Sequence, residues 1–196
     1  MVTAAFMDAK QIMSMPYTWI PSSKYFTTST RTFFTNFQKA IVGNHGDNIF
    51  FRNLFNSLIV ATVCALTTVF LASLCGFGLA KYKFKGQKAV FMAIMSTMMI
   101  PFEAIMIPLY LVATKMKIIN TIPGLIIPFL VSAFGVFQMR QYLSTFPTEY
   151  LDAARVDGMG EFGIYSRIVL PNSTPVIATL AILSFRNQWD NLLWPL

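Results

Sequence analysis

The sequence predicts an all-α protein that crosses a membrane about four times. Of its 196 residues, 55% are hydrophobic and only 12% are charged, whereas soluble domains carry about 25% charged residues. The apolar residues are also concentrated in long stretches that hold almost no charge. A large soluble helical core is the alternative, but four such stretches would leave too little polar surface for water. We therefore favour a polytopic membrane protein.

Four stretches are long enough to cross a bilayer, because a helix needs roughly 20 residues to span a hydrocarbon core about 30 Å thick. The first and last contain no charged residue over 54–80 and 168–185, and the second contains only Glu103. The third is uncharged over 118–139. The predicted spans are 54–80, 89–112, 120–142 and 168–190, all approximate.

The first span carries small residues at every fourth position, namely Ala72, Gly76 and Ala80. Small side chains at this spacing let helices approach closely in lipid. Cys64 and Cys75 lie on the same predicted helix. Eleven residues of helix separate them by about 16 Å, so they cannot form a disulfide with each other. We expect both to act as small apolar packing residues.

The second span is interrupted by Pro101 and Pro108, with Glu103 between them. Proline removes an internal hydrogen bond and kinks a membrane helix. An acidic residue inside a span is a functional candidate, so Glu103 is a candidate for a translocation path. The alternative is that Glu103 lies near the outer interface, where its charge costs little.

Residues 1–53 differ in composition from the rest and are predicted to form an extracytoplasmic or interfacial segment. The stretch 11–53 is rich in Ser, Thr, Pro and aromatic residues, which suits a membrane interface. Its one histidine, His45, lies in the turn-like string GNHGD and is expected to be solvated. Residues 54–196 form the predicted transmembrane domain.

Charge gives a partial indication of topology. The net charge is +7, and the loop 81–88 (KYKFKGQK) holds four lysines and no acid. Short basic loops usually face the cytoplasm, and the span count places the loop 143–167 on the same side. Basic residues are nevertheless spread almost evenly over both sets of loops, so charge alone does not fix the orientation. There is no basic face with side chains that could read bases, so no nucleic-acid partner is expected.

No group of residues in the sequence is suited to catalysis. One histidine cannot supply a His-rich metal site, and no phosphate-binding loop of the G-x-x-x-x-G-K-[ST] type is present. We therefore expect no enzyme activity, no metal site and no cofactor bound by this chain.

The polar stretch LDAARVDGMG, residues 151–160, lies between two apolar runs. Pro147 can open a helix at its first turn, and Glu149 and Asp152 suit a helix N-terminus. Leu151, Ala154 and Arg155 are expected on one side of this helix. Gly158 is expected to end it in a left-handed conformation.

A second short helix is predicted over 160–168, with Phe162, Tyr165 and Val169 on its apolar side. Leu170 and Pro171 then lead into the last span. Two short helices joined at a glycine elbow would present a compact, partly polar and partly apolar knob. Such a knob is suited to docking into another protein.

The residues of this elbow resemble the EAA loop of the permease subunits of bacterial ABC importers. The family pattern is Glu-Ala-Ala, three residues, Gly, and then an Ile-x-Leu-Pro ending. The matching residues here are Asp152-Ala153-Ala154, Gly158 and Ile168-Val169-Leu170-Pro171. Asp152 replaces the usual glutamate, which keeps the charge and shortens the reach by one methylene.

Further strings, spread over residues 16–196, resemble the carbohydrate-uptake, maltose-permease-like branch of that family. They are NSLIVA, GFGLAKYKFKGQK, MMIPFEAIMIPLYLV, NTIPGLIIPFL, FGVFQMRQYL and WDNLLWPL. The resemblance implies a subunit of the bacterial cell inner membrane that forms half of a sugar-transport path. It implies four kinds of partner: the lipid bilayer, a second permease subunit, a dimer of ABC ATPase subunits that holds ATP-Mg, and an extracytoplasmic solute-binding protein.

The resemblance also assigns residues to contact with the ATPase. They are Asp152, Ala153, Ala154, Asp157, Gly158, Met159 and Phe162. Asp152 is expected to be a salt-bridge or capping partner for a basic group of the ATPase.

Family members have about six spans and cytoplasmic termini, so the first and last family spans are expected to be missing here. The family topology places 11–53 and 113–123 outside and 81–88 and 143–167 inside. The alternatives are a truncated, non-functional permease copy, a secondary transporter or channel, and a membrane enzyme. Inverted repeats or several buried charges would favour a secondary transporter, and neither occurs.

Overall fold

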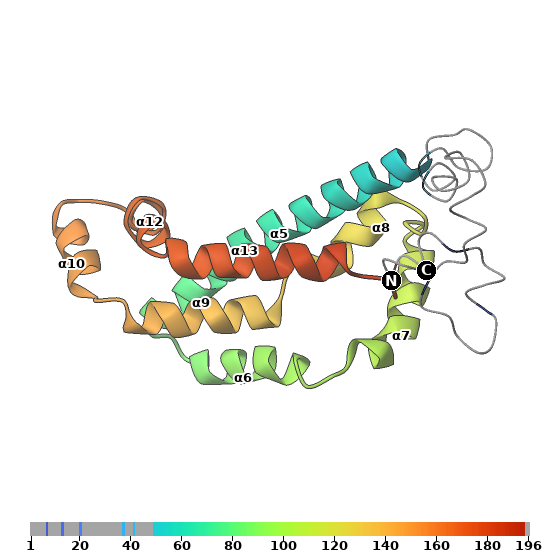
Figure 1. Ribbon diagram of the computed structural model, residues 1–196. Coiled ribbons are helices and arrows are strands. Elements are labelled where there is room, and N and C mark those ends of the chain that lie inside the picture. The colour runs from blue at the N-terminus through green and yellow to red at the C-terminus, as the bar shows by residue number, and fades with distance from the viewer. Residues whose placement is uncertain are drawn as a thin grey trace. The chain divides into compact units, whose positions relative to one another are not determined.

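The computed structural model describes residues 49–194, together with Met7, Met13, Ile20, Phe37 and Ile41. Every regular element in this part of the chain is a helix (Figure 1), which confirms the all-α prediction. Most of the predicted segment 1–53, including His45, falls outside the described residues.

The first span is a single long helix, α5 (Ile49–Lys81), of 33 residues. This helix begins five residues before the predicted start at position 54. The predicted boundary between the N-terminal segment 1–53 and the transmembrane domain 54–196 therefore falls inside α5. Alone among the described helices, α5 is long and apolar enough to cross a membrane unaided. Up to four spans result if each of three bent helix pairs counts as one, in line with the predicted number.

The second predicted span is two helices rather than one kinked helix. α6 (Gln87–Thr97) and α7 (Phe102–Lys115) meet at an angle of 94°. Pro101 precedes α7 in an extended conformation, which ends the helical path because proline cannot donate a backbone hydrogen bond. Pro108 lies inside α7 without breaking it. The interruption predicted for this span is therefore present before Pro101, with a bend much sharper than a kink, and Pro108 does not interrupt α7.

The third span is also divided. It comprises α8 (Ile122–Ile126), the 3₁₀ turn η2 (Ile127–Phe129) and α9 (Ala133–Thr145), with a bend of 42°. Side-chain hydroxyls cap both α-helices, since Thr121 accepts from the Gly124 amide and Ser132 from the Gly135 amide. Such caps satisfy amide groups that lack a partner within the helix.

The last span begins later than predicted. The elbow contains α10 (Glu149–Val156), α11 (Glu161–Ile164), the π-helical turn η3 (Tyr165–Val169) and α12 (Leu170–Asn172). The chain then bends by 80° into α13 (Thr174–Trp189). Residues 168–172 therefore continue the elbow, and the predicted start of the span at 168 was wrong. Pro171 and Pro175, on either side of the bend, each remove a backbone donor.

Small residues bring α5, α9 and α13 together, as the four-residue spacing predicted. A Cβ atom added to Gly76 would lie 2.6 Å from Cβ of Met139 in α9. One added to Gly135 would lie 3.1 Å from both Ala72 and Leu180. The two cysteines differ, because Cys64 is buried and Cys75 is exposed; Cys75 therefore does not pack in the core.

The two predicted cytoplasmic loops lie at the same end of the bundle (Figure 1). Tyr82 of the first loop donates a hydrogen bond to Glu161 of the second, and the Lys81 ammonium donates to the carbonyl of Phe146. Both loops therefore lie together at one end of the bundle, which is the arrangement that a shared side of the membrane requires. The turn between α7 and α8 lies at the other end, near Trp194, whose indole donates to the Gly124 carbonyl.

Candidate functional site

The elbow projects beyond the ends of α9 and α13 (Figure 1). Its first helix, α10, carries Glu149 and Asp152 in its first turn and Arg155 in its last, an order that complements the helix dipole. Asp157 caps its C-terminus, and Gly158 follows with φ +79°. This is the left-handed conformation predicted for Gly158.

Two buried side chains attach α10 to the bundle. Leu151 is fully buried and Ala154 is 5% exposed, and both belong to the apolar core that includes Leu143 and Tyr165. Arg155 does not share their side, contrary to expectation, because it is exposed and turns towards neighbouring acids. The inner face of α10 is thus packed against the bundle, and its outer face is exposed.

The outer face of the elbow is apolar as well as polar. Val156 is 87% exposed, Phe162 68% and Tyr150 62%. The predicted apolar side of the second helix is therefore only partly correct, since Tyr165 and Val169 are buried while Phe162 faces outwards. Exposed apolar side chains of this size, gathered on one projecting tip, are typical of a protein-binding surface.

Of the seven residues predicted to contact an ATPase, five lie on the exposed surface, namely Asp152, Ala153, Asp157, Gly158 and Phe162. Met159 is half-buried and packs against the core. Ala154 is buried beneath the elbow and therefore anchors the helix instead of forming the surface.

Arg155 joins the two arms of the elbow. Its Nε donates to Oε1 of Glu161 at 2.8 Å, and its Nη1 donates to Oδ1 of Asp152, also at 2.8 Å. The guanidinium thus bridges an acid on α10 and an acid on α11, across the turn at Gly158. Asp152, predicted to meet a basic group of the ATPase, already has a partner within this chain.

Tyr82 extends this network to the first loop. Its hydroxyl donates to Oε2 of Glu161, and its ring contacts Phe77 of α5 edge to face at 5.5 Å. Phe77 in turn lies 5.7 Å from the ring of Tyr165, whose hydroxyl is 2.7 Å from that of Ser73. A continuous path of contacts therefore connects the elbow to the end of α5.

The hydrogen bonds of this network favour the charged forms of Glu161 and Arg155 and the neutral form of Tyr82. Hydrogen bonds from Arg155 and then from Tyr82 lower the pKa of the Glu161 carboxyl. The bond to Glu161, ahead of that to Asp152, raises the pKa of the Arg155 guanidinium. Burial, followed by the bond to Glu161, raises the pKa of the Tyr82 hydroxyl. Because Tyr82 and Glu161 are 79 positions apart, their contact was not predictable from the sequence. By contrast, the sequence places Asp152 and Arg155 three positions apart on a predicted helix, a spacing that favours an ion pair.

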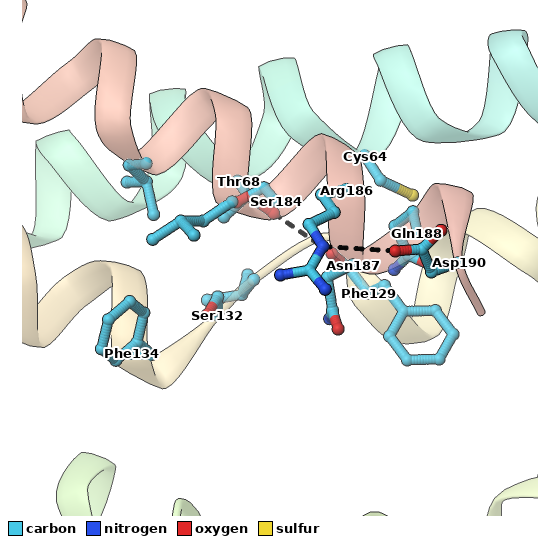
Figure 2. A pocket seen from close by; sticks show the side chains of 13 residues that line it. Cys64, Thr68, Phe129, Ser132, Phe134, Ser184, Arg186, Asn187, Gln188 and Asp190 are labelled. Carbon is cyan, nitrogen blue, oxygen red and sulfur yellow. Dashed lines mark hydrogen bonds and ion pairs between the residues drawn. The ribbon is translucent and has the colours of Figure 1, made fainter.

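A second feature is a cavity of about 630 Å³ bordered by α5, the segment before α9, and α13 (Figure 2). Polar side chains from the end of α13 line one wall, among them Ser184, Asn187 and Gln188, and Phe129 and Phe134 line another. Arg186 pairs with Asp190 at 3.3 Å, so the two charged groups of the lining compensate each other. No pattern in the sequence predicts that these residues share a cavity.

Glu103 does not reach this cavity. It lies in the first turn of α7, is exposed, and is absent from the cavity lining. An acid in the first turn of a helix is favourable without any transport role. Among the described residues, no group of three His, Cys, Asp or Glu side chains is arranged to hold a metal ion.

The bent helix pairs, the close α5–α9 crossing and the projecting elbow define a polytopic α-helical membrane protein. Within that class, residues 68–196 match the family described as "Binding-protein-dependent transport system inner membrane component". The chain belongs to this family of transport components.

Curated relatives agree with the family. The chain is 41% identical over 152 residues to the arabinooligosaccharides transport system permease protein AraQ of Bacillus subtilis, with 78% of this chain and 54% of that protein covered. It is 37% identical over 142 residues to the lactose transport system permease protein LacG of Rhizobium radiobacter, with coverages of 72% and 52%. The chain thus spans about half the length of these relatives.

A more distant relative covers more of the chain. The sn-glycerol-3-phosphate transport system permease protein UgpE of Escherichia coli O1:K1 is 30% identical over 195 residues, with 98% of this chain and 66% of that protein covered. The fold is similar to a chain of a bacterial ABC transporter involved in the import of the acidic polysaccharide alginate. That match has a TM-score of 0.74 and 19% identity, and covers 98% of this chain and 64% of the other.

Proposed function

We propose that this chain is a membrane-spanning subunit of an ATP-driven importer for sugars or related polyhydroxylated solutes, in the bacterial cell membrane. The observation that carries the proposal is the elbow: two short helices fixed to the bundle by Leu151 and Ala154, with Phe162 and Val156 exposed at the tip. The family membership and the names of the relatives support the same function.

In this proposal the elbow docks into a cleft of an ABC ATPase subunit. Exposed apolar side chains enter the cleft, while Asp152 and Asp157 contribute charged groups and Ala153 and Gly158 contribute small ones. Asp152 keeps one carboxylate oxygen, Oδ2, that no hydrogen bond within the described residues occupies. That oxygen is available to a basic group of the ATPase, so the ion pair with Arg155 does not conflict with docking.

Closure of the ATPase dimer would move the elbow as a rigid body. Arg155 fixes the angle between its arms, and Tyr82 carries the displacement to α5. Rotation of helices that are packed at small residues is a common way to alternate access in transporters. The chain binds no nucleotide in this scheme, because ATP-Mg and its hydrolysis belong to the partner ATPase.

The cavity beside α13 is the candidate for this subunit's half of the solute path. Amide and hydroxyl groups from Asn187, Gln188 and Ser184, together with aromatic Phe129 and Phe134, suit a neutral polyhydroxylated solute. A second permease subunit would supply the other half, and an extracytoplasmic binding protein would deliver the solute. Glu103 is exposed and is not part of the cavity lining, so it is not assigned to the path.

The test is reconstitution of the chain with its second permease subunit, ATPase and binding protein in liposomes. Uptake of arabinooligosaccharide or lactose should require ATP and the binding protein together. Uptake driven by an ion gradient without ATP would instead indicate a secondary transporter. Stable assembly with the ATPase but no uptake of any solute tested would favour a non-functional copy.

A further inference from the structure

Arg140 is a cation inside the third span, and none of the acidic residues that the structure describes pairs with it. Its guanidinium carbon lies 3.9 Å from the centroid of the Phe91 ring in α6. Its Nε is buried, and no group within residues 49–194 forms a hydrogen bond with it or an ion pair with the guanidinium. Arg186, by contrast, is paired with Asp190. A charge inside a span is costly unless another group compensates it.

The arginine is held in position from two sides. Phe91 stacks on Phe137, one turn before Arg140 on α9, with the ring centroids 6.4 Å apart and the planes at 19°. The backbone of Arg140 lies against Gly76 of α5, so α9 cannot rotate freely to release the side chain. The ring of Phe91 fixes the plane of the guanidinium, while the residue as a whole stays partly exposed.

The depth of Arg140 matches a membrane interface. It lies five residues before the end of α9 at Thr145, and Phe91 lies four residues after the start of α6 at Gln87. At a rise of 1.5 Å per residue, both lie about 6–8 Å from the helix ends that adjoin the loop 81–88. Arginine side chains at this depth extend towards the lipid headgroups.

The surroundings are positively charged and open. Lys83, Lys85 and Lys88 are exposed, and the loop 81–88 contains no acid. Lys88 precedes Phe91 by three positions on α6 and so lies on the same side of that helix. No residue of α6 is buried, which leaves its outer surface free of other described elements.

We propose that Arg140 and Lys88 bind the phosphate of an anionic phospholipid in the leaflet that adjoins the loop 81–88. The two Nη groups of a guanidinium match two phosphate oxygens, and the lysine adds a second positive charge. Basic sites between membrane helices on one side of a bilayer are suited to such headgroups. The proposal requires that the chain spans a bilayer, but it does not depend on coupling to an ATPase.

Native mass spectrometry of the full chain in mild detergent, with equimolar phosphatidylglycerol and phosphatidylcholine, tests the proposal. The unmodified protein should retain phosphatidylglycerol in preference to phosphatidylcholine. Arg140→Gln should abolish that preference, and Lys88→Gln should weaken it. Lys115→Gln, which removes an exposed charge at the other end of the bundle, is the control and should retain the preference. Unchanged retention in Arg140→Gln would overturn the proposal.

A second measurement, made on the unmodified chain, distinguishes a phospholipid from free phosphate as the ligand. Phosphatidylglycerol should raise the thermal unfolding midpoint of the unmodified chain, and phosphatidylcholine or inorganic phosphate should not. An equal rise with inorganic phosphate would mean that the site takes a free anion, and the lipid assignment would be wrong. It would also be wrong if Arg140→Gln kept its lipid but lost the second permease subunit, because an acid of that subunit would then be the partner.

Discussion

Arg155 Nε and Glu161 Oε1 lie 2.8 Å apart across the turn at Gly158. This contact joins α10 to α11 directly, while the same guanidinium reaches Asp152. The elbow is therefore held by side chains as well as by its backbone. The angle between its two arms is therefore set by contacts within this chain.

Gly158→Val should reduce assembly with the ATPase and solute uptake while leaving the amount of protein in the membrane unchanged. A β-branched residue at φ +79° resists the left-handed conformation, at a cost of about 1–2 kcal/mol. The space around Gly158 is open, so the strain comes from the backbone and not from a clash.

Two controls distinguish backbone strain from side-chain size at that turn. Gly160→Val should be close to neutral, because Gly160 is extended at φ −71° and its surroundings are also open. Gly158→Asn should be milder than Gly158→Val, since asparagine tolerates the left-handed region. ATPase co-purification and uptake are measured for all three. Equal losses in Gly158→Val and Gly160→Val would contradict the account.

Arg155→Lys should lower uptake although the charge is kept. Only a guanidinium can present Nη1 to Asp152 while Nε reaches Glu161, and an ammonium lacks that fork. A double-mutant cycle with Glu161→Gln should show strong non-additivity in uptake. Additive effects of the two substitutions would mean that the ion pair is not part of coupling.

Tyr82→Phe should reduce uptake a few-fold while the ATPase still co-purifies. The substitution removes the hydroxyl that bonds Glu161 but keeps the ring against Phe77, so docking survives and transmission to α5 weakens. Tyr110→Phe is the control, since Tyr110 is an exposed tyrosine of α7. The prediction fails if Tyr82→Phe and Tyr110→Phe transport equally well.

Gly76→Ala should destabilise the helix bundle itself. The new methyl group would lie 2.6 Å from Cβ of Met139, and overpacking of this kind costs about 1–3 kcal/mol. Gly78→Ala, two positions along the same helix, meets nothing within 4 Å and should be tolerated. Thermal unfolding in detergent compares the two variants. A similar unfolding midpoint for both would contradict the proposed α5–α9 contact.

Features that depend on local chemistry were predictable from the sequence. The conformation of Gly158 follows from glycine's freedom at a helix end, and the close α5–α9 crossing follows from small residues spaced every four positions. The apolar runs gave the number of potential spans, because span length depends only on bilayer thickness.

Features that depend on tertiary packing were not predictable. Pro101 indicates a break, but the 94° angle between α6 and α7 depends on what each helix packs against. Burial of Ala154 and exposure of Phe162 depend on the side that α10 turns to the bundle. The contact of Tyr82 with Glu161 joins loops that are distant in sequence, and without a structure no spacing rule relates them.

Site-specific photo-crosslinking in the assembled importer tests the central claim most directly. A crosslinking amino acid replaces Val156, which is 87% exposed at the elbow, or Met116, which is 55% exposed near the end of α7. If the elbow docks into the ATPase, the Val156 variant should form a covalent adduct with the ATPase subunit and the Met116 variant should not. Absence of that adduct at Val156 in a complex that still transports solute would contradict the account.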